Sequence, residues 1–237
     1  MYLKKIKINN KFYNLYFKKG VFEPTATTIF LINGFLLKNS KVINKQILDL
    51  GCGSGIVSVV LNHKVKDNLF SASDLNQASL DCATKNFKKF KIKGTVKKGD
   101  LLKPWEGIKF DFIINDISGI SSLLAQKSKW FVNIPSDTGI DGTKLTISII
   151  KNSHKNLSKK GKLYLPLISL SNTNKIIKIA KKTFNRVKII SENKWFLPKE
   201  IEKHKKLLEK LKMGGEIDYE YKFGKFICFT KIIELKN

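Results

Sequence analysis

Residues 45–63, KQILDLGCGSGIVSVVLNH, decide the fold of this chain. The apolar segment ILDL is typical of a short buried strand, and the apolar segment IVSVVLNH that follows is typical of a helix. Between them Gly51, Gly53 and Gly55 form a turn in which the backbone can approach a ligand, beside the free amides of a helix N-terminus. A strand, a glycine turn and a helix in this order predict an open α/β sheet that binds its ligand at the carboxyl end of a strand.

Strand and helix patterns alternate along most of the chain, which predicts a mostly parallel sheet with helices on both faces. Residues 2–17 form two alternating apolar and polar stretches and are expected to make an N-terminal β-hairpin. Two closing strands that share a tight turn would make one edge of the sheet antiparallel. We expect one domain over residues 1–237, with the hairpin and a helix in 1–40 and the sheet in 41–237. In the second half of the chain we expect a helix over 141–160, a strand over 162–169, a helix over 200–212 and the closing strands over 216–223 and 225–235.

The charge of the chain is strongly basic, with 45 Lys and Arg against 19 Asp and Glu and a net charge of +26. A charge of this size attracts nucleic acid or an anionic membrane surface. Arg186 is the only arginine, however, and a bias toward lysine is what an A/T-rich genome imposes without any binding function. Arginine forks onto phosphate and stacks on bases, so an RNA surface uses it more often. A solvated surface set by codon bias and a weak RNA or ribosome association therefore both stay open.

Several protein classes are disfavoured by the sequence. No apolar run reaches the roughly 18 to 20 residues of a membrane span, and the N-terminus alternates instead of forming the apolar block of a signal peptide. Cys52, Cys82 and Cys228 lie far apart, and the three histidines show no ligand spacing. We expect a cytoplasmic protein with no disulfide framework, no metal site and no membrane partner.

Asp49 precedes the glycine turn, and a second acidic residue, Asp74, ends the strand that follows the turn. A carboxylate at this place can accept hydrogen bonds from both hydroxyls of a ribose. Asp74 together with the glycine turn therefore predicts a site for a nucleoside, with no need for a pyrophosphate.

The segment Asp49-Leu50-Gly51-Cys52-Gly53-Ser54-Gly55 resembles the first motif of the class I S-adenosylmethionine-dependent methyltransferases. Later landmarks of that family follow in order over residues 20–170: the ribose-binding acid, the acid that meets the adenine amino group, and an Asn-containing segment, 115–118, at the reaction centre. The resemblance implies a Rossmann-like doubly wound sheet of seven strands and S-adenosyl-L-methionine as cofactor. The cofactor-binding residues it implies are Asp49, Gly51, Gly53, Gly55, Asp74, Leu75, Asp100, Leu101 and Asn115.

Residues 21–28, VFEPTATT, are similar to the V-Y-E-P-x-x-D-T segment of the release-factor glutamine methyltransferases. Those enzymes and related rRNA guanine methyltransferases carry N-P-P-Y at the reaction centre, where this chain has N-D-I-S. Both prolines are missing, Ser118 cannot stack on a planar substrate, and Thr27 stands where the subgroup has Asp. The resemblance makes Phe22, Pro24 and Ser118 candidate substrate residues.

These departures argue against a flat amide or a nucleobase as the acceptor. An aliphatic amine needs no stacking partner. It must lose a proton before it attacks, because free lysine has a pKa of about 10.4 and is protonated at neutral pH. Asp116 could take that proton if it points into the site, and Asn115 could orient the attacking nitrogen. The N-x-x-S pattern is in this respect similar to ribosomal-protein lysine methyltransferases. We therefore predict N-methylation of an amine-bearing acceptor, a protein or a small molecule, with Asn115 and Asp116 as the catalytic residues and no metal.

Three other functions remain open on the sequence. The cofactor's own α-amino group could attack its γ-carbon, which would give azetidine-2-carboxylate and methylthioadenosine. The lysine-rich surface could recruit RNA to an RNA methyltransferase. The chain could also be a nucleoside-binding module without catalysis.

Overall fold

The computed structural model describes residues 1–117, 119–131 and 137–237, which divide into two compact units. Unit 1 consists of Met1–Asp116, Ser153–Tyr164 and Asn237, and unit 2 consists of Ile117–Asn152 and Leu165–Lys236. The single domain expected from the sequence stays a prediction. Each unit is described by itself below.

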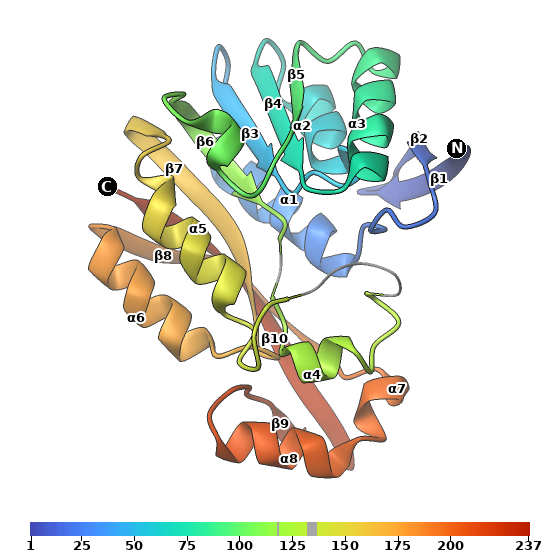
Figure 1. The fold of residues 1–237 in the computed structure, drawn as a ribbon, viewed down its shortest axis with the longest axis vertical. Helices are drawn as coiled ribbons and strands as arrows, with labels where there is room; N and C mark the ends of the chain where they lie inside the picture. The colour runs from blue at the N-terminus through green and yellow to red at the C-terminus, as the bar shows by residue number, and fades with distance from the viewer. Residues whose placement is uncertain (118, 132–136) are drawn as a thin grey trace. The chain divides into compact units, whose positions relative to one another are not determined.

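Unit 1 contains the N-terminal hairpin, a parallel sheet and three helices of nine residues or more (Figure 1). The strand β7 (Leu157–Ile168) begins in this unit and ends in unit 2. The other elements of unit 1 are β1 (Tyr2–Ile8), β2 (Lys11–Phe17), α1 (Ala26–Asn39), β3 (Gln46–Leu50), α2 (Ile56–Lys64), β4 (Leu69–Asp74), α3 (Gln77–Lys89), β5 (Gly94–Lys98), the 3₁₀ turn η1 (Lys103–Trp105) and β6 (Phe110–Asn115).

The strands of this sheet pair in the order β5-β4-β3-β6-β7, and every pair is parallel. Leu50 at the end of β3 is in register with Ser73 of β4 and with Asn115 of β6. Asp74, the last residue of β4, is in register with Lys98 at the end of β5. The carboxyl ends of four neighbouring strands therefore lie at one edge of the sheet, which is where an open α/β sheet binds its ligands.

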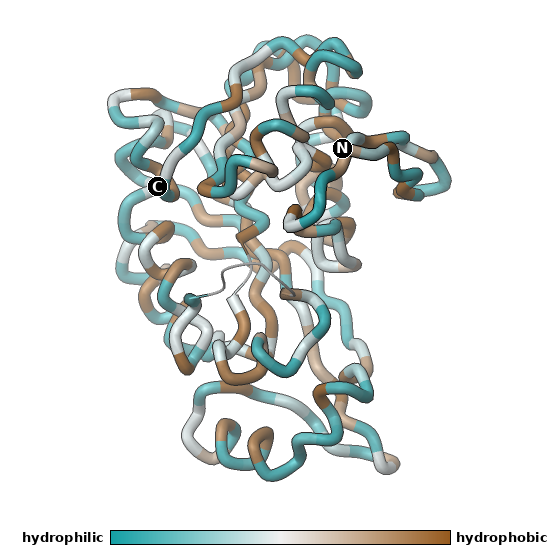
Figure 2. The backbone as a smooth tube through the Cα atoms, turned by 45° about the vertical axis from the view of Figure 1, so that its right-hand side comes forward, coloured by the Kyte–Doolittle hydropathy of each residue, from teal (hydrophilic) through white to brown (hydrophobic). Residues whose placement is uncertain are grey.

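The hairpin β1–β2 packs on α3, and apolar and polar residues alternate along it (Figures 1 and 2). Asn86, a fully buried residue of α3, makes the connection. Its side chain accepts a hydrogen bond from the Tyr16 amide (2.8 Å) and donates to the Tyr16 carbonyl (3.1 Å). It also donates to the carbonyl of Ser54 in the glycine turn (2.8 Å). One amide side chain thus joins the hairpin, α3 and the turn.

Unit 2 contains the end of β7 and an antiparallel group of strands. The strand β10 pairs with β8 along ten residues of register and with the short β9 along three. The elements are α4 (Ser122–Ala125), α5 (Lys144–Ser153), α6 (Thr173–Thr183), β8 (Arg186–Phe196), α7 (Lys199–Glu202), α8 (Lys205–Met213), β9 (Glu220–Lys222) and β10 (Lys225–Lys236).

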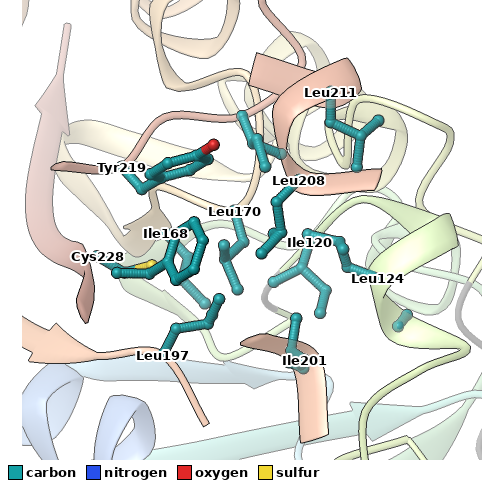
Figure 3. Packing of buried hydrophobic residues seen from close by; sticks show 13 residues of the cluster. Ile120, Leu124, Ile168, Leu170, Leu197, Ile201, Leu208, Leu211, Tyr219 and Cys228 are labelled. Carbon is teal, nitrogen blue, oxygen red and sulfur yellow. The ribbon is translucent and has the colours of Figure 1, made fainter. Parts of the chain in front are cut away.

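An apolar cluster holds the second half of unit 2 together (Figure 3). Leu208 and Leu211 of α8 and Ile201 of α7 pack against Ile120, Leu170 and their neighbours. The rings of Trp130 and Trp195 meet edge to face with centroids 6.0 Å apart at its margin. Side chains from α4, α7, α8 and β10 thus share one core.

The α/β class, the mostly parallel sheet and the separate N-terminal hairpin are confirmed. The main sheet has eight strands, β3–β10, one more than the seven that the resemblance implies. The expected antiparallel hairpin exists as β9–β10, but its first strand is only Glu220–Lys222, and the long partner of β10 is β8.

Two element boundaries predicted from the sequence are wrong. The helix expected over 141–160 is α5, Lys144–Ser153, because the chain enters β7 at Leu157. Gly161 does not end an element but lies within β7, where a Cβ would come within 2.8 Å of the carbonyl of Phe110. The helix expected over 200–212 is divided into α7 and α8, because His204 (φ −94°, ψ 44°) leaves the helical conformation.

Candidate functional site

The glycine turn after β3 has the backbone that its sequence requires. Gly51, Gly53 and Gly55 all adopt positive φ, at 72°, 52° and 78°, a region that side chains with a Cβ rarely enter. The amides of Gly51 and Cys52 donate to the carbonyl of Ser73 at the end of β4 (2.9 and 3.0 Å). The turn is thereby fixed beside the end of β4.

Asp74 is held by backbone amides on both of its carboxylate oxygens. Oδ2 accepts from the amide of Gly53 (2.9 Å), and Oδ1 accepts from the amide of Asn76 (2.8 Å). Each oxygen of a carboxylate has a further acceptor position, so two hydroxyls can still bind. Asn76 itself is fixed, since it caps α3 at the amide of Ala78 and donates to the carbonyl of Gly20. The structure therefore presents Asp74 in one orientation beside the glycine turn.

Asp49 is a buried carboxylate in β3 with one oxygen satisfied and one not. Oδ2 accepts from the amide (3.0 Å) and the hydroxyl (2.7 Å) of Ser58, whereas Oδ1 is buried without a hydrogen-bond partner among the described residues. Burial raises the pKa of Asp49 to about 7 against the two bonds from Ser58, and the charges of Asp116 and Asp74 raise it further. A buried carboxylate oxygen of this kind costs free energy unless a proton, a hydrogen-bond donor or a cation reaches it.

Asp116 directly follows β6 and is half-buried. Its amide donates to the carbonyl of Leu50 (3.3 Å), and its Oδ2 accepts from the hydroxyl of Thr28 (2.8 Å). Burial raises the pKa of Asp116 to about 7, and the Thr28 hydrogen bond opposes that rise. Asn115, the residue before it, is fully buried at the end of β6. Thr28 lies in the first turn of α1, where its oxygen also accepts from the Thr25 amide (3.2 Å).

The third strand end contributes Asp100 and Leu101. The Gly99 amide donates to the Asp74 carbonyl (3.1 Å), so the turn after β5 lies next to the end of β4. Asp100 is exposed and forms an ion pair with Lys103 (2.9 Å), and Leu101 adopts a positive φ of 50°. Leu75, which follows Asp74, is 62% exposed. An exposed leucine beside a fixed carboxylate offers an apolar surface for a flat ligand to cover.

The candidate substrate residues are only partly brought to this edge. The carbonyl of Phe22 lies 3.7 Å from where a Cβ on Gly53 would be, so the segment before α1 reaches the glycine turn. Phe22 and Pro24 are both half-buried. Ser118 lies outside the described residues.

Two residues of the site, Ser58 and Asn76, are given no role by the sequence motifs, and Thr28 ends the 21–28 segment without a role assigned to it there. Ser58 binds Asp49, Thr28 binds Asp116, and Asn76 fixes Asp74. For Asn76 the signal is available, because an Asn just before an apolar-periodic segment is a helix cap. Ser58 is an ordinary small polar residue in a helix, and only its place beside the buried Asp49 gives it a role.

Two general features of the described residues bear on the site. None of their helices is long and apolar enough to span a membrane. The three cysteines are free and buried, and burial raises the pKa of the Cys52 thiol well above its usual value.

Comparison with known proteins finds sequence similarity over part of the chain and similarity of fold over most of it. Residues 15–116 match the family described as Methyltransferase small domain. A "Ribosomal protein L11 methyltransferase" of Thermotoga neapolitana is 30% identical over 101 residues, which cover 43% of this chain and 36% of that protein. A "Ribosomal RNA small subunit methyltransferase C" of Haemophilus influenzae is 28% identical over 132 residues, or 50% of this chain and 38% of the relative. The chain thus spans less than half the length of these curated relatives.

Solved structures share the fold over nearly the whole chain. A T. Thermophilus 16S rRNA methyltransferase superposes with a TM-score of 0.63 at 13% identity, over 99% of this chain and 50% of the other. A ribosomal protein L11 methylase from Lactobacillus delbrueckii subsp. bulgaricus gives a TM-score of 0.56 at 16% identity, over 93% and 84%. Residues 15–116 thus match the methyltransferase small domain, and the chain shares its fold with these solved methyltransferase structures.

Proposed function

We propose that this chain transfers the methyl group of S-adenosylmethionine to an amine nitrogen of a protein or small-molecule acceptor. The relatives named above support a methyltransferase, and two neighbours in fold are described as complexes with AdoMet and with SAH. S-adenosylmethionine supplies a methyl group that is already activated on a positively charged sulfur.

One observation supports this cofactor most: Oδ1 of Asp49 is buried and has no partner among the described residues. The α-ammonium group of S-adenosylmethionine carries the charge and the donors that this oxygen lacks. Asp74, held by two amides, would accept the ribose hydroxyls, while the exposed Leu75 would cover one face of the adenine. Asp100 and Leu101, at the neighbouring strand end, would meet the adenine edge. These residues fit the three chemical parts of the cofactor.

Two residues at the end of β6 are proposed to act on the acceptor. The Asn115 carboxamide would accept a hydrogen bond from the attacking nitrogen and orient its lone pair. Asp116, with a pKa raised to about 7 by burial, is suited to take a proton from an amine near neutral pH. Orientation of the two reactants supplies most of the rate enhancement, up to about 7 to 11 kcal/mol in favourable cases.

An RNA acceptor is the second candidate. A relative named for the ribosomal RNA small subunit supports it, since that likeness extends over half of the chain. Against it stands the N-D-I-S segment, which lacks an aromatic residue to stack on a base. A mixture of ribosomal protein and RNA, incubated with the chain and S-adenosylmethionine that carries a radioactive methyl group, tests both acceptors. After the protein and the RNA are separated, the label is found in one or the other.

The experiment that tests the reaction type uses the protein with S-adenosylmethionine alone and identifies the nucleoside released. The proposal predicts that S-adenosylhomocysteine forms only after an amine acceptor is added. Methylthioadenosine released without any acceptor would contradict methyl transfer and establish the cyclase reaction. Cofactor binding without either product, across protein and RNA acceptors, would leave a binding module and would also contradict the proposal.

A further inference from the structure

The outer face of the N-terminal hairpin combines lysines with two aromatic rings, of which Phe12 is exposed and Tyr16 is half-buried. The register pairs Leu3 with Tyr16, Lys5 with Asn14 and Lys7 with Phe12, and these six residues form the face turned away from the buried residues Tyr13, Leu15 and Phe17. We call these six residues the outer face. It is a two-stranded surface with one aromatic residue toward each end of β2, about 13 Å apart for four residues of extended chain.

Each aromatic ring of the outer face lies under lysine ammonium groups. The Phe12 ring is 53% exposed and has the Nζ of Lys5 4.2 Å from its centroid and that of Lys7 at 5.8 Å. The Tyr16 ring has the Nζ of Lys85 at 4.8 Å and that of Lys89 at 5.2 Å, both from α3. A base that stacks on either ring would replace the ammonium group on that ring face and leave it free to meet a neighbouring phosphate.

Acidic residues are missing from this part of the sequence. Residues 1–22 contain six lysines and no Asp or Glu, and residues 82–99 contain seven lysines and again no acid. The three acids that border these segments are engaged: Glu23 pairs with Lys4, Asp81 with Lys18 and Asp100 with Lys103. Codon bias explains a high lysine total, but it does not explain why the lysines around the outer face are without neutralising carboxylates.

His63, at the end of α2, lies among lysines near the hairpin. Its ring lies edge to face with Tyr13 of β2 at 6.1 Å. Burial lowers the pKa of His63, and the charges of Lys11, Lys64 and Lys66 lower it further. The hairpin and the end of α2 therefore lie in a positive potential that draws in a polyanion.

From this geometry we infer that the outer face, with Lys85 and Lys89, is a docking surface for single-stranded RNA. Bases stack on the Phe12 and Tyr16 rings, and phosphates bind the surrounding ammonium groups. An anionic membrane suits the face less well, because ammonium groups lie over the rings that would have to enter the hydrocarbon. The inference goes beyond the proposed function and rests on it only for the purpose of the bound RNA, which would be a neighbour of the acceptor.

The test is fluorescence anisotropy with the full chain and a labelled oligouridylate of about 12 nucleotides. Phe12→Ala and Tyr16→Ala should each weaken binding at least about fivefold, since a stacked base contributes that much or more. Phe223→Ala is the matched control, because Phe223 is also an exposed phenylalanine in a hairpin, in unit 2, and should change nothing.

The charge is tested by the salt dependence of the same affinity. Lys5→Gln with Lys7→Gln should lower the slope of log affinity against log salt by about 1.4, or about 0.7 per phosphate contact. Lys181→Gln with Lys182→Gln, which removes two exposed lysines from α6, should leave the slope unchanged.

Three results would overturn the inference. One is equal loss of RNA binding in the hairpin variants and their controls. Another is binding of double-stranded RNA as tightly as the single strand, without effect of Phe12→Ala. The third is binding to phosphatidylserine vesicles in place of RNA. Calorimetry with S-adenosylmethionine separates this from the proposed function, because the hairpin variants should keep the wild-type cofactor affinity.

Discussion

Two carboxylates with raised pKa values lie at the ends of neighbouring strands in unit 1: Asp49 is the penultimate residue of β3, and Asp116 follows β6. Asp49 precedes Leu50, and Asp116 donates its amide to the Leu50 carbonyl. Each carboxylate keeps one hydroxyl donor, from Ser58 and Thr28 respectively. Burial raises both pKa values to about 7, so the charge of this region changes near neutral pH. Perturbed carboxylates of this kind are concentrated at functional sites.

Asp49 should make the protein less stable as the pH rises. Its folded-state pKa of about 7 lies above the unfolded value of about 3.9, so its contribution is complete below about pH 4 and is lost as the pH rises through about 7. Asp49→Asn removes this loss. In urea unfolding between pH 4 and 8, the free energy of unfolding of the variant relative to wild type should therefore increase with pH. A difference that is constant or that decreases with pH would show that Asp49 has an ordinary pKa.

Asp116 should govern the pH dependence of turnover if it takes a proton from the amine. The wild-type rate should rise through about pH 7, and Asp116→Asn should be slow at neutral pH and partly recover at alkaline pH. Thr28→Val removes the hydrogen bond that lowers the pKa of Asp116, so its rate should rise at a higher pH than in wild type. Steady-state rates from pH 6 to 10 test both variants. Full activity of Asp116→Asn at pH 7 would contradict a base at this position.

Asn115 should affect catalysis more than cofactor binding. Asn115→Ala removes one oriented acceptor, so turnover should fall by about 100-fold or more, as for other single hydrogen bonds formed in a transition state. Cofactor affinity should change by less than about 1 kcal/mol, because the ribose and adenine contacts remain. Comparing kcat with calorimetric affinity separates the two effects. A fully active Asn115→Ala variant would mean that the reaction centre lies elsewhere.

At the scale of elements, the site depends on how the hairpin, α3 and the glycine turn are joined. Asn86 makes three side-chain hydrogen bonds to backbone groups of Tyr16 and Ser54 while fully buried. Gly55 is packed just as closely, since a Cβ there would lie 3.3 Å from the Cβ of Ala83 in α3. The turn is therefore positioned by α3 as well as by the strands on either side of it.

Asn86→Ala should destabilise unit 1 and loosen the turn. It leaves buried backbone groups without partners, each at a cost of about 1 to 3 kcal/mol. The free energy of urea unfolding should fall by at least about 2 kcal/mol, and cofactor affinity should fall with it. Asn152→Ala is the matched control, since Asn152 is exposed and its side chain bonds only within α5, to the Ser148 carbonyl. Equal stability of the two variants would refute this role.

Along the whole chain, the local patterns predict the parallel part of the fold well. Strands β3 and β4 and their helices follow from apolar segments, turn glycines and an Asn cap, all of which act over a few residues. The boundaries near Gly161 and His204 do not follow, because tertiary contacts decide them. Long-range pairing has the same effect at β10, whose partner along most of its length is β8 and not the neighbouring strand in sequence.

The sequence motifs identify the candidate residues Asp74 and the glycine turn, but they do not identify the residues that hold the carboxylates in place. Asp74 and the glycine turn can be identified because each has a fixed place relative to a strand end. Thr28 is 88 residues from Asp116, and no local pattern joins them. The raised pKa values also depend on burial, which a sequence motif does not contain.

The central claim is that the carboxyl ends of β3, β4 and β5 form a site for S-adenosylmethionine, and calorimetric titration tests it most directly. Wild type should bind S-adenosylmethionine at one site, and Asp74→Ala should weaken binding by about 1.5 to 3 kcal/mol, the range for hydrogen bonds to a charged group. Asp81→Ala is the control, since it removes an ion pair with Lys18 and a hydrogen bond from Gln77 at the surface of α3 and should leave the affinity unchanged. No binding by wild type, or equal affinity of a folded Asp74→Ala variant, would contradict the account.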